Sequence, residues 1–230
     1  MTSESKVSEY EIYLNVPTLL GLQKDPAARA HHDELLFQVV HQVEELWMKL
    51  AMDELAAAIR YLDADDIGNA LFNLRRVTEL ERMMIAQMRI IETMSPHSYL
   101  AVRKVLGQGS GQESPGFNGM LRVAPELGAA MARTLARANT TALAVHQDPT
   151  KQPLLFQLTE CVLDFDELFQ TFRYQHILLV KRIIGAGTPS LKGKPTELLE
   201  RSMRTAFYPE LWEVRETMFA DFVRGVSLKK

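Results

Sequence analysis

Residues 33–62 read DELLFQVVHQVEELWMKLAMDELAAAIRYL and contain neither glycine nor proline. Apolar residues recur along this stretch mainly at steps of three and four, the spacing that gathers side chains on one face of an α-helix. They are Leu36, Val40, Val43, Trp47, Leu50 and Leu55. The stretch therefore predicts one long helix.

The same spacing predicts further helices, separated by residues that break them. A second helix runs from about Ile67 to Met94 and stops at Ser95-Pro96, because proline disfavours the helical conformation in the residue before it. Ser95 can cap the helix that follows. The other expected helices are 125–145, 153–184 and one beginning near 209, and the expected glycine-rich loops are 107–119 and 185–196. Strand-type alternation is not sustained anywhere, so the predicted fold class is all-α.

The composition limits the class of protein. At 230 residues, 47% apolar and 24% charged, the chain suits one sizeable hydrophobic core, and we treat 1–230 as a single domain. No apolar run is long enough to span a membrane, and the polar first nine residues lack the apolar core of a signal peptide. We therefore expect a cytoplasmic protein. A formal charge of −3 gives no basic footprint for nucleic acid, which leaves a small molecule as the expected partner.

Cys161 is the only cysteine in the sequence. It cannot form a disulfide within the chain, and the sequence has neither a multi-cysteine zinc site nor a Cys-x-x-Cys-His motif for covalent heme attachment. The nucleophile-elbow, P-loop, dinucleotide-binding and His-Glu-x-x-His motifs are also absent. A heme, if bound, is therefore held non-covalently.

Two histidines occupy positions at which the helical pattern expects an apolar residue. His176 falls on the stripe formed by Phe165, Phe169, Phe172, Val180 and Ile183. His41 lies four residues after Phe37 on one helix face. Each is either a buried core histidine satisfied by a hydrogen bond or a ligand at a functional site, and the pattern leaves both interpretations open. His97 and His146 lie in turn-like segments and are expected at the surface.

Six segments resemble tryptophan 2,3-dioxygenases, in the same order along the chain. They are the arm from Tyr10 to Gln23, HHDELLFQVVHQVEELWMKL at 31–50, IETMSP at 91–96, SGQESPGFN at 110–118, FDELFQTFRYQHILLVKRIIG at 165–185 and FYPELWEVR at 207–215. The resemblance implies an all-α helical bundle that encloses a b-type heme. It also implies a homo-oligomer, a dimer or tetramer, in which an N-terminal arm of about residues 1–24 packs on a neighbouring subunit.

The resemblance implies a role for each matching residue. His176 matches the proximal ligand of the heme iron, His41 the distal histidine that faces the substrate, and Phe37 a wall of the pocket. The further heme contacts implied are Ser110, Gly111 and Phe172, and the further substrate contacts are Tyr10, Tyr13, Phe117, Asn118 and Thr188. These roles agree with the chemistry, because one imidazole ligand leaves the opposite side of the iron open for O2. His41 can then accept a hydrogen bond from an indole N–H or a phenol O–H and orient the ring.

The sequence departs from the family at two substrate contacts. Asn118 stands where the family has an arginine that binds the substrate carboxylate, so a charge-assisted clamp of about 1.5–3 kcal/mol is lost. Arg122, four residues later, is either a displaced anchor or a solvated surface arginine. In the loop after Thr188, residues 189–192 (PSLK) replace the family's glycines and serines.

The resemblance therefore implies a heme-dependent oxygenase that uses O2 to oxidise an indole-bearing substrate. One alternative is a heme monooxygenase of a modified tryptophan, a tyrosine or another aromatic compound in specialised metabolism, because the iron site is kept while the substrate contacts change. A second alternative is a non-enzymatic bundle that binds or senses heme.

Overall fold

The structure is a computed structural model that describes residues 7–107, 109, 111–185 and 205–227. Its α-helices are α1 Glu9–Tyr13, α2 Val16–Leu20, α3 Glu34–Asp63, α4 Ile67–Ile91, α5 Pro96–Leu106, α6 Pro115–Arg137, α7 Ala142–Gln147, α8 Pro153–Ile183 and α10 Pro209–Ser227. Two short 3₁₀ helices, η1 Pro26–Ala28 and η2 Gly111–Glu113, lie in the connections. These described residues contain no β-strand, which confirms the all-α prediction. No helix in the described ranges is both long and apolar enough to cross a membrane.

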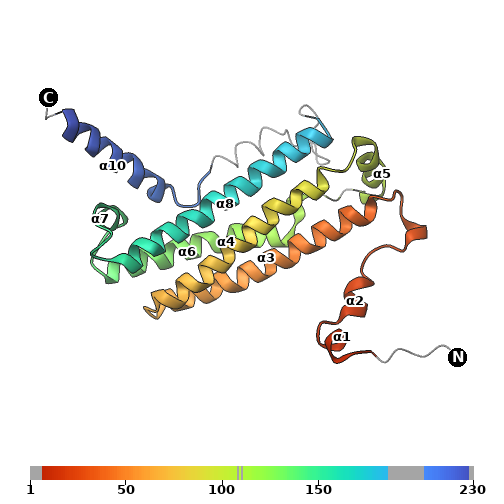
Figure 1. Cartoon of the computed structure of the whole chain (residues 1–230), viewed down its shortest axis with the longest axis horizontal. Coiled ribbons are helices and arrows are strands. Elements are labelled where there is room, and N and C mark those ends of the chain that lie inside the picture. The colour runs from red at the N-terminus through yellow and green to blue at the C-terminus, as the bar shows by residue number, and fades with distance from the viewer. Residues whose placement is uncertain (1–6, 108, 110, 186–204, 228–230) are drawn as a thin grey trace.

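Four long helices, α3, α4, α6 and α8, form the body of the molecule (Figure 1). Helix α3 packs mainly on α4 and α6, and α8 packs mainly on α4, so α3 and α8 occupy opposite corners of the bundle. The core between them is built from fully buried side chains: Leu55, Leu62, Leu74, Leu127, Leu158, Phe165 and Phe169. The apolar stripe predicted on α8 thus supplies Phe165 and Phe169 to this core, whereas of the stripe predicted on α3 Leu55 is fully buried and Leu50 is exposed.

A second, smaller apolar cluster closes the end of the bundle where α3 begins and α8 ends. Val40 of α3, Ile91 of α4 and Leu179 and Ile183 of α8 are buried together there, with Tyr99 of α5 packed against them. Helix α5 lies at this end (Figure 1). His41 and His176 are both carried by the segments that meet here, so this end of the bundle holds the candidate site.

The start of α6 differs from the prediction. We expected a loop over 107–119 and one helix over 125–145. Instead, α6 begins at Pro115, continues through Pro125 and ends at Arg137, and a separate helix, α7, covers Ala142–Gln147. The Ser114 hydroxyl caps the helix by accepting the Phe117 N–H, and Pro115 sits in the first turn, where its missing N–H costs nothing. Pro125 is exposed within the helix, where packing of the flanking turns offsets its missing hydrogen bond. The sequence was misread because Gly116 and Gly119 serve close helix packing rather than a turn.

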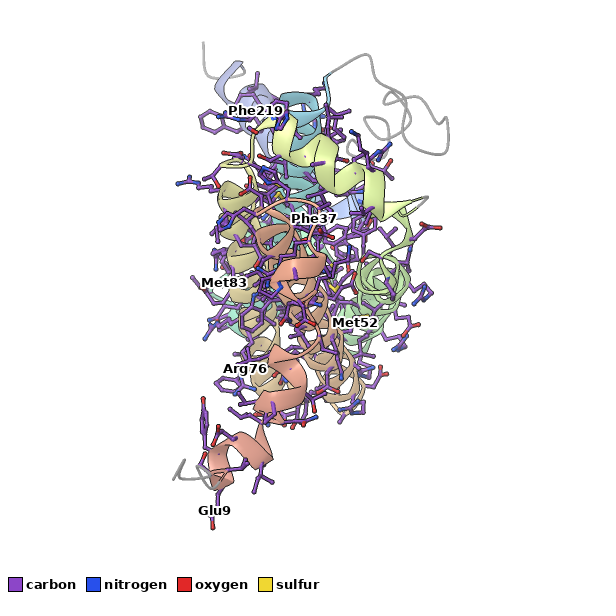
Figure 2. The ribbon with its side chains drawn as sticks, turned by 90° about the vertical axis from the view of Figure 1, so that its right-hand side faces the viewer. Glu9, Phe37, Met52, Arg76, Met83 and Phe219 are labelled. Carbon is purple, nitrogen blue, oxygen red and sulfur yellow. The ribbon has the colours of Figure 1, made fainter. Side chains whose placement is uncertain are left out.

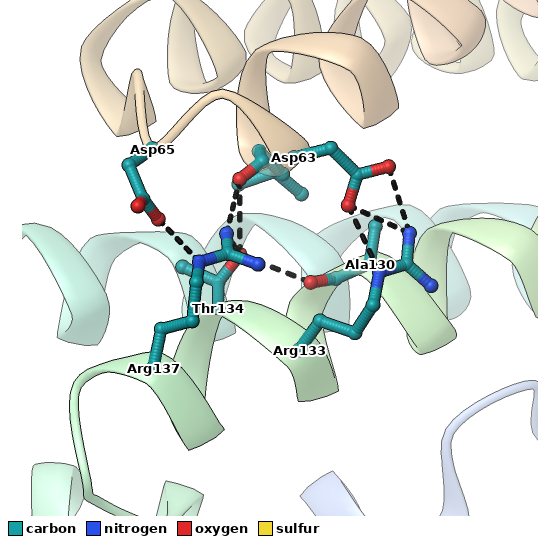
Figure 3. A network of polar contacts seen from close by, with 7 residues as sticks. Asp63, Asp65, Ala130, Arg133, Thr134 and Arg137 are labelled. Atoms are coloured by element: carbon teal, nitrogen blue, oxygen red, sulfur yellow. Dashed lines mark hydrogen bonds and ion pairs between the residues drawn. The ribbon is translucent and has the colours of Figure 1, made fainter.

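At the far end of the bundle, two arginines of α6 hold the end of α3 (Figure 3). The Arg133 guanidinium donates two hydrogen bonds of 2.9 Å to the Asp63 carboxylate. Arg137 Nε donates to Asp65 Oδ1 at 2.6 Å. Because Glu45 lies opposite Gly116 at the other end of the same pair, α3 and α6 run in the same direction. These exposed ion pairs add little stability but fix the register of the two helices.

Helices α1 and α2 leave the bundle as an arm, and α10 projects from the opposite end (Figure 1). The arm has no buried residue and exposes apolar side chains: Tyr10, Ile12, Tyr13, Leu14, Leu19, Leu20 and Leu22. Glu9 lies at the far tip of this arm (Figure 2). Among the described residues, the bundle does not cover these side chains.

Candidate heme and substrate site

His41 lies two turns into α3, with its ring held by the helix that carries it. Its Nδ1 is 2.7 Å from the Phe37 carbonyl oxygen. Because a carbonyl oxygen only accepts, Nδ1 carries the proton and Nε2 presents a lone pair. The Phe37 ring packs on the imidazole, with 4.1 Å between the ring centroids. His41 is therefore an oriented hydrogen-bond acceptor.

His176 comes to the same end of the bundle from α8, the helix diagonal to α3. It is partly buried, and Phe172, one turn earlier, is buried beneath it. The backbone of Gly111 in η2 approaches the outer nitrogen of the ring, since a Cβ at that position would lie 3.9 Å from His176 Nε2. The backbone of η2 therefore lies beside Nε2 of His176.

Both imidazoles are neutral at pH 7. Burial lowers the pKa of His41 below its usual 6.5, partly offset by the Phe37 carbonyl and the Glu45 carboxylate. Burial, and then the neighbouring His41, lower the pKa of His176 to about 4. The two rings are close enough for the charge of one to affect the pKa of the other, so α3 and α8 bring them to the same region. A neutral imidazole is the form that binds a metal ion or accepts a hydrogen bond.

Phe117 packs against α8. It lies in the first turn of α6 and stacks on Phe169 of α8, with centroids 5.5 Å apart and ring planes 18° apart. Asn118, the next residue, donates from Nδ2 to the Ser114 carbonyl at 2.9 Å. The Asn118 amide is thus tied back to the start of its own helix.

Arg122 lies on the exposed part of α6. Its Nη2 is 3.7 Å from the position that a Cβ of Gly119 would occupy. Gly116 lies opposite Glu45, and Arg122 follows six residues later, roughly 9 Å further along the helix axis. The structure therefore places Arg122 away from the end of the bundle that carries the two histidines.

The structure does not bring every predicted residue to this site. Tyr10 and Tyr13 are 71% and 89% exposed on the arm, outside the bundle of their own subunit. Ser110 and Thr188, together with residues 189–192, lie outside the described residues. His97 is exposed, as expected.

The expectation for His146 was wrong, because this side chain is buried. Its Nε2 lies 2.8 Å from Glu160 Oε1 of α8, and its ring packs edge-on against Phe156. Arg215 of α10 bonds to the same Glu160 carboxylate. Packing of α8 and α10 around α7 covers the imidazole. The sequence around His146 cannot predict this packing, because the contacts come from distant segments.

Sequence reasoning also missed two acids that follow His41. Glu45 accepts hydrogen bonds from the Ser114 hydroxyl and the Gly116 N–H. Glu44 is partly buried beside Gln87 of α4, and this burial raises the pKa of its carboxyl to about 7. The available signal was the spacing, because Glu45 lies four residues after His41 and so shares its helix face.

Known proteins resemble this chain over most of its length. The profile of the tryptophan 2,3-dioxygenase family matches residues 1–134, more than half of the chain. This chain belongs to the tryptophan 2,3-dioxygenase family. It is 31% identical to the tryptophan 2,3-dioxygenase of Myxococcus xanthus, over 90% of this chain and 88% of that protein. It is 31% identical to the enzyme of Erythrobacter litoralis, over 90% and 97% of the two chains.

A third relative, the tryptophan 2,3-dioxygenase of Kineococcus radiotolerans, is 29% identical over 94% of this chain and 93% of its own length. The family profile covers α1 to α5 and nearly all of α6 but ends before α8. The family membership thus rests on the His41 side of the bundle and on the relatives that match nearly the whole chain.

Proposed function

We propose that this chain is a heme-dependent oxygenase that uses O2 to oxidise an indole-bearing, tryptophan-like substrate. Membership of the tryptophan 2,3-dioxygenase family makes it an oxidoreductase of the dioxygenase type. The observation that carries the proposal is the meeting of His41 and His176 at one end of the bundle, with His41 Nδ1 tied to Phe37 so that Nε2 is free to accept.

The residues present fit a b-type heme held by His176. A heme supplies four ring nitrogens to its iron, so one protein imidazole on an apolar helix face completes the ligand set and leaves one side open. His176 is neutral, its Nε2 is approached by a glycine rather than by a side chain, and Phe172 adds an apolar surface beside it. When bound, the heme iron supplies the site at which O2 is activated. Gly111 and Ser110 are the loop residues that we propose line it.

On the opposite side, His41 orients the substrate. Its Nε2 accepts the indole N–H and holds the ring in one orientation, while Phe37 packs beside the imidazole and shields it from water. Phe117, Asn118 and Thr188 are the proposed further contacts of the substrate. Because Asn118 is neutral and its amide donates to Ser114, this position supplies no cation for a carboxylate.

Because Asn118 replaces the arginine that binds the substrate carboxylate in the family, a second candidate function is a monooxygenase that acts on a modified tryptophan or another aromatic compound. The two candidates share the heme and His41 and differ in the number of oxygen atoms inserted. A bundle that only binds or senses heme is the remaining alternative. It would hold heme and O2 without responding to aromatic ligands.

Anaerobic titration separates these possibilities. The ferrous protein is mixed without O2 with tryptophan, tryptamine, methylated tryptophans, indole and tyrosine, and binding is followed in the heme absorption spectrum. Labelled O2 is then admitted, and mass spectrometry counts the oxygen atoms in the product. We expect two labelled atoms in a ring-cleaved product. One labelled atom selects the monooxygenase, and a spectrum that no aromatic ligand changes rejects enzymatic function.

We further propose that the chain acts as a homo-oligomer in which the arm covers a second copy. The arm exposes Tyr10, Tyr13 and Leu20, each at least 70% accessible, and a surface of this kind is usually buried in an interface. Tyr10 and Tyr13 would then contact the substrate of the neighbouring subunit. Mass photometry of the intact protein tests this, and a monomer at micromolar concentration would reject it.

A further inference from the structure

The carboxylate of Glu45 closes the N-terminal end of α6. The Ser114 hydroxyl donates to Glu45 Oε1, and the Gly116 N–H donates to Oε2 at 2.9 Å. Ser114 in turn accepts the Phe117 N–H at 2.9 Å. One acid from α3 therefore satisfies, directly or through Ser114, the free donors in the first turn of a 23-residue helix. A negative charge at this position also interacts favourably with the helix dipole.

The two helices approach so closely here that only glycine fits. A Cβ at Gly116 would lie 2.8 Å from Glu45 Oε2 and 2.8 Å from Met48 Cβ. A Cβ at Gly119, one turn later, would overlap the flexible end of the Met52 side chain, which would have to move. The backbone of α6 thus rests directly on α3, and the Glu45 hydrogen bonds set where α6 begins along it.

This contact joins the two sides of the candidate site. Glu45 lies one turn beyond His41 on the same face of α3, close enough for its charge to act on the imidazole. On the other side, the anchored turn carries Phe117, which stacks on Phe169, two turns before His176. One chain of contacts from α3 to α8 therefore includes the carboxylate of Glu45, the first turn of α6 and Phe117.

We propose that Glu45 is a positioning residue for the reaction. It holds the first turn of α6 at a fixed place relative to His41, so that the ring oriented by His41 and the part of the substrate that meets Phe117 and Asn118 are presented together. This inference rests on the proposed function, because it concerns the same substrate. It adds a residue that touches neither substrate nor heme and still sets the geometry of binding.

Two substitutions at Glu45 separate the effect of its negative charge from the effect of its hydrogen-bond acceptors. Glu45→Gln keeps the length of the side chain, and its carbonyl can still accept the Gly116 N–H while its amide turns toward Ser114. Glu45→Ala removes both acceptors and leaves the first turn of α6 uncapped. Glu126→Ala, which removes an exposed acid on α6 itself, is the matched control.

The first measurement needs no turnover. Hydrogen–deuterium exchange of the intact protein should show faster exchange at the amides of Gly116 and Phe117 in Glu45→Ala, with Glu45→Gln close to wild type and Glu126→Ala unchanged. Heme content should stay the same in all four proteins, because His176 is untouched. Unchanged exchange at these two amides in Glu45→Ala would overturn the proposed contact.

The second measurement is binding and turnover with the aromatic ligand that binds wild type most tightly. We expect Glu45→Ala to weaken equilibrium binding roughly ten- to a hundred-fold, the loss of one or two charge-assisted hydrogen bonds in the bound arrangement, and Glu45→Gln to restore most of it. Wild-type affinity and kcat in Glu45→Ala, measured well below its unfolding temperature, would make Glu45 a helix cap and nothing more. If Glu45→Ala does not fold, Ser114→Ala takes its place, because it removes the hydroxyl that donates to Glu45 and accepts the Phe117 N–H. Faster exchange at Phe117 together with weaker binding then supports positioning, and faster exchange with wild-type binding rejects it. A wild-type protein that binds no aromatic ligand overturns the proposed function itself, and the positioning role with it.

Discussion

The Nδ1 of His41 lies 2.7 Å from the carbonyl oxygen of Phe37, one turn earlier in α3, and this contact fixes which nitrogen of the imidazole faces the site. Because the proton is held at Nδ1, Nε2 acts as an acceptor. We therefore expect His41→Ala to keep its heme while substrate affinity or turnover falls about tenfold, the value of one neutral hydrogen bond. Heme content is read from the absorption spectrum and turnover from product analysis.

The same contact gives a direction to the pH dependence. Burial lowers the pKa of His41 below 6.5, so Nε2 stays unprotonated down to mildly acidic pH and accepts a hydrogen bond there. We expect activity to be lost with a midpoint at a pH lower than 6.5, because protonation turns Nε2 of His41 into a donor. This acidic limb should be absent from the residual activity of His41→Ala, and an identical pH profile in the two proteins would contradict the role of Nε2.

Replacing His176 by Ala should empty the heme site. The neutral imidazole, with its pKa lowered to about 4, is available to bind iron at any pH near neutrality. His97→Ala, which removes an exposed histidine, is the control and should retain heme. Full heme content and an unchanged ferric spectrum in His176→Ala would show that the proximal ligand lies elsewhere. Heme loss in His41→Ala instead would reverse the two roles.

Replacing Glu81 by an apolar residue should stabilise the protein. Its side chain is fully buried in α4, and neither carboxylate oxygen has a hydrogen-bond partner within the described part of the chain. Burial, and then the charge of Asp166, raise its pKa well above 4.5. Asp166 itself accepts from the Phe207 and Tyr208 N–H groups and from Trp212 Nε1. We expect Glu81→Leu to raise the free energy of unfolding at pH 7 by on the order of 1–3 kcal/mol.

The pH dependence of that gain has a definite sign. A carboxyl whose folded-state pKa is raised leaves the protein most stable below its unfolded pKa of 4.5, and this stability is lost as the pH rises through the raised folded value. The difference between Glu81→Leu and wild type should therefore widen from pH 4.5 to pH 8 in urea unfolding. Glu79→Gln, at an exposed acid of the same helix, should show no such widening. A constant difference would mean that Glu81 is not destabilised by ionisation.

Arg122 should not anchor the substrate. It is exposed on α6, well along the helix from the turn that Glu45 holds. We expect wild type and Arg122→Ala to rank tryptophan, tryptamine and an uncharged indole identically in equilibrium binding. A selective loss of tryptophan affinity in Arg122→Ala would instead show that Arg122 replaces the arginine missing at Asn118.

Deleting residues 1–14 should impair turnover more than heme binding. The deletion removes α1 with Tyr10 and Tyr13, whose exposed rings we propose to contact a neighbouring subunit's substrate. A chain lacking only residues 1–6 keeps α1 and should behave as wild type. Full activity of a monomeric 15–230 chain would show that Tyr10 and Tyr13 do not contribute to the site.

Local periodicity was sufficient for most of the helices. The apolar stripes predicted 33–62, 153–184 and a helix beginning near 209, and the structure has Glu34–Asp63, Pro153–Ile183 and Pro209–Ser227. These predictions hold because a helix is set by neighbours three and four residues apart. The start of α6 was missed because its cap is completed by Glu45, about seventy residues earlier in the sequence.

The sequence by itself determined the all-α class, the family, and the two histidines on apolar helix faces, because each of these depends only on residue types and on spacings of a few residues. Only the tertiary structure decided that α3 and α8 bring His41 and His176 to one end of the bundle, that Glu45 caps α6, and that His146 is buried. Those contacts join residues from separate helices, and which faces of two helices meet depends on how the whole core packs, a property that no single segment carries.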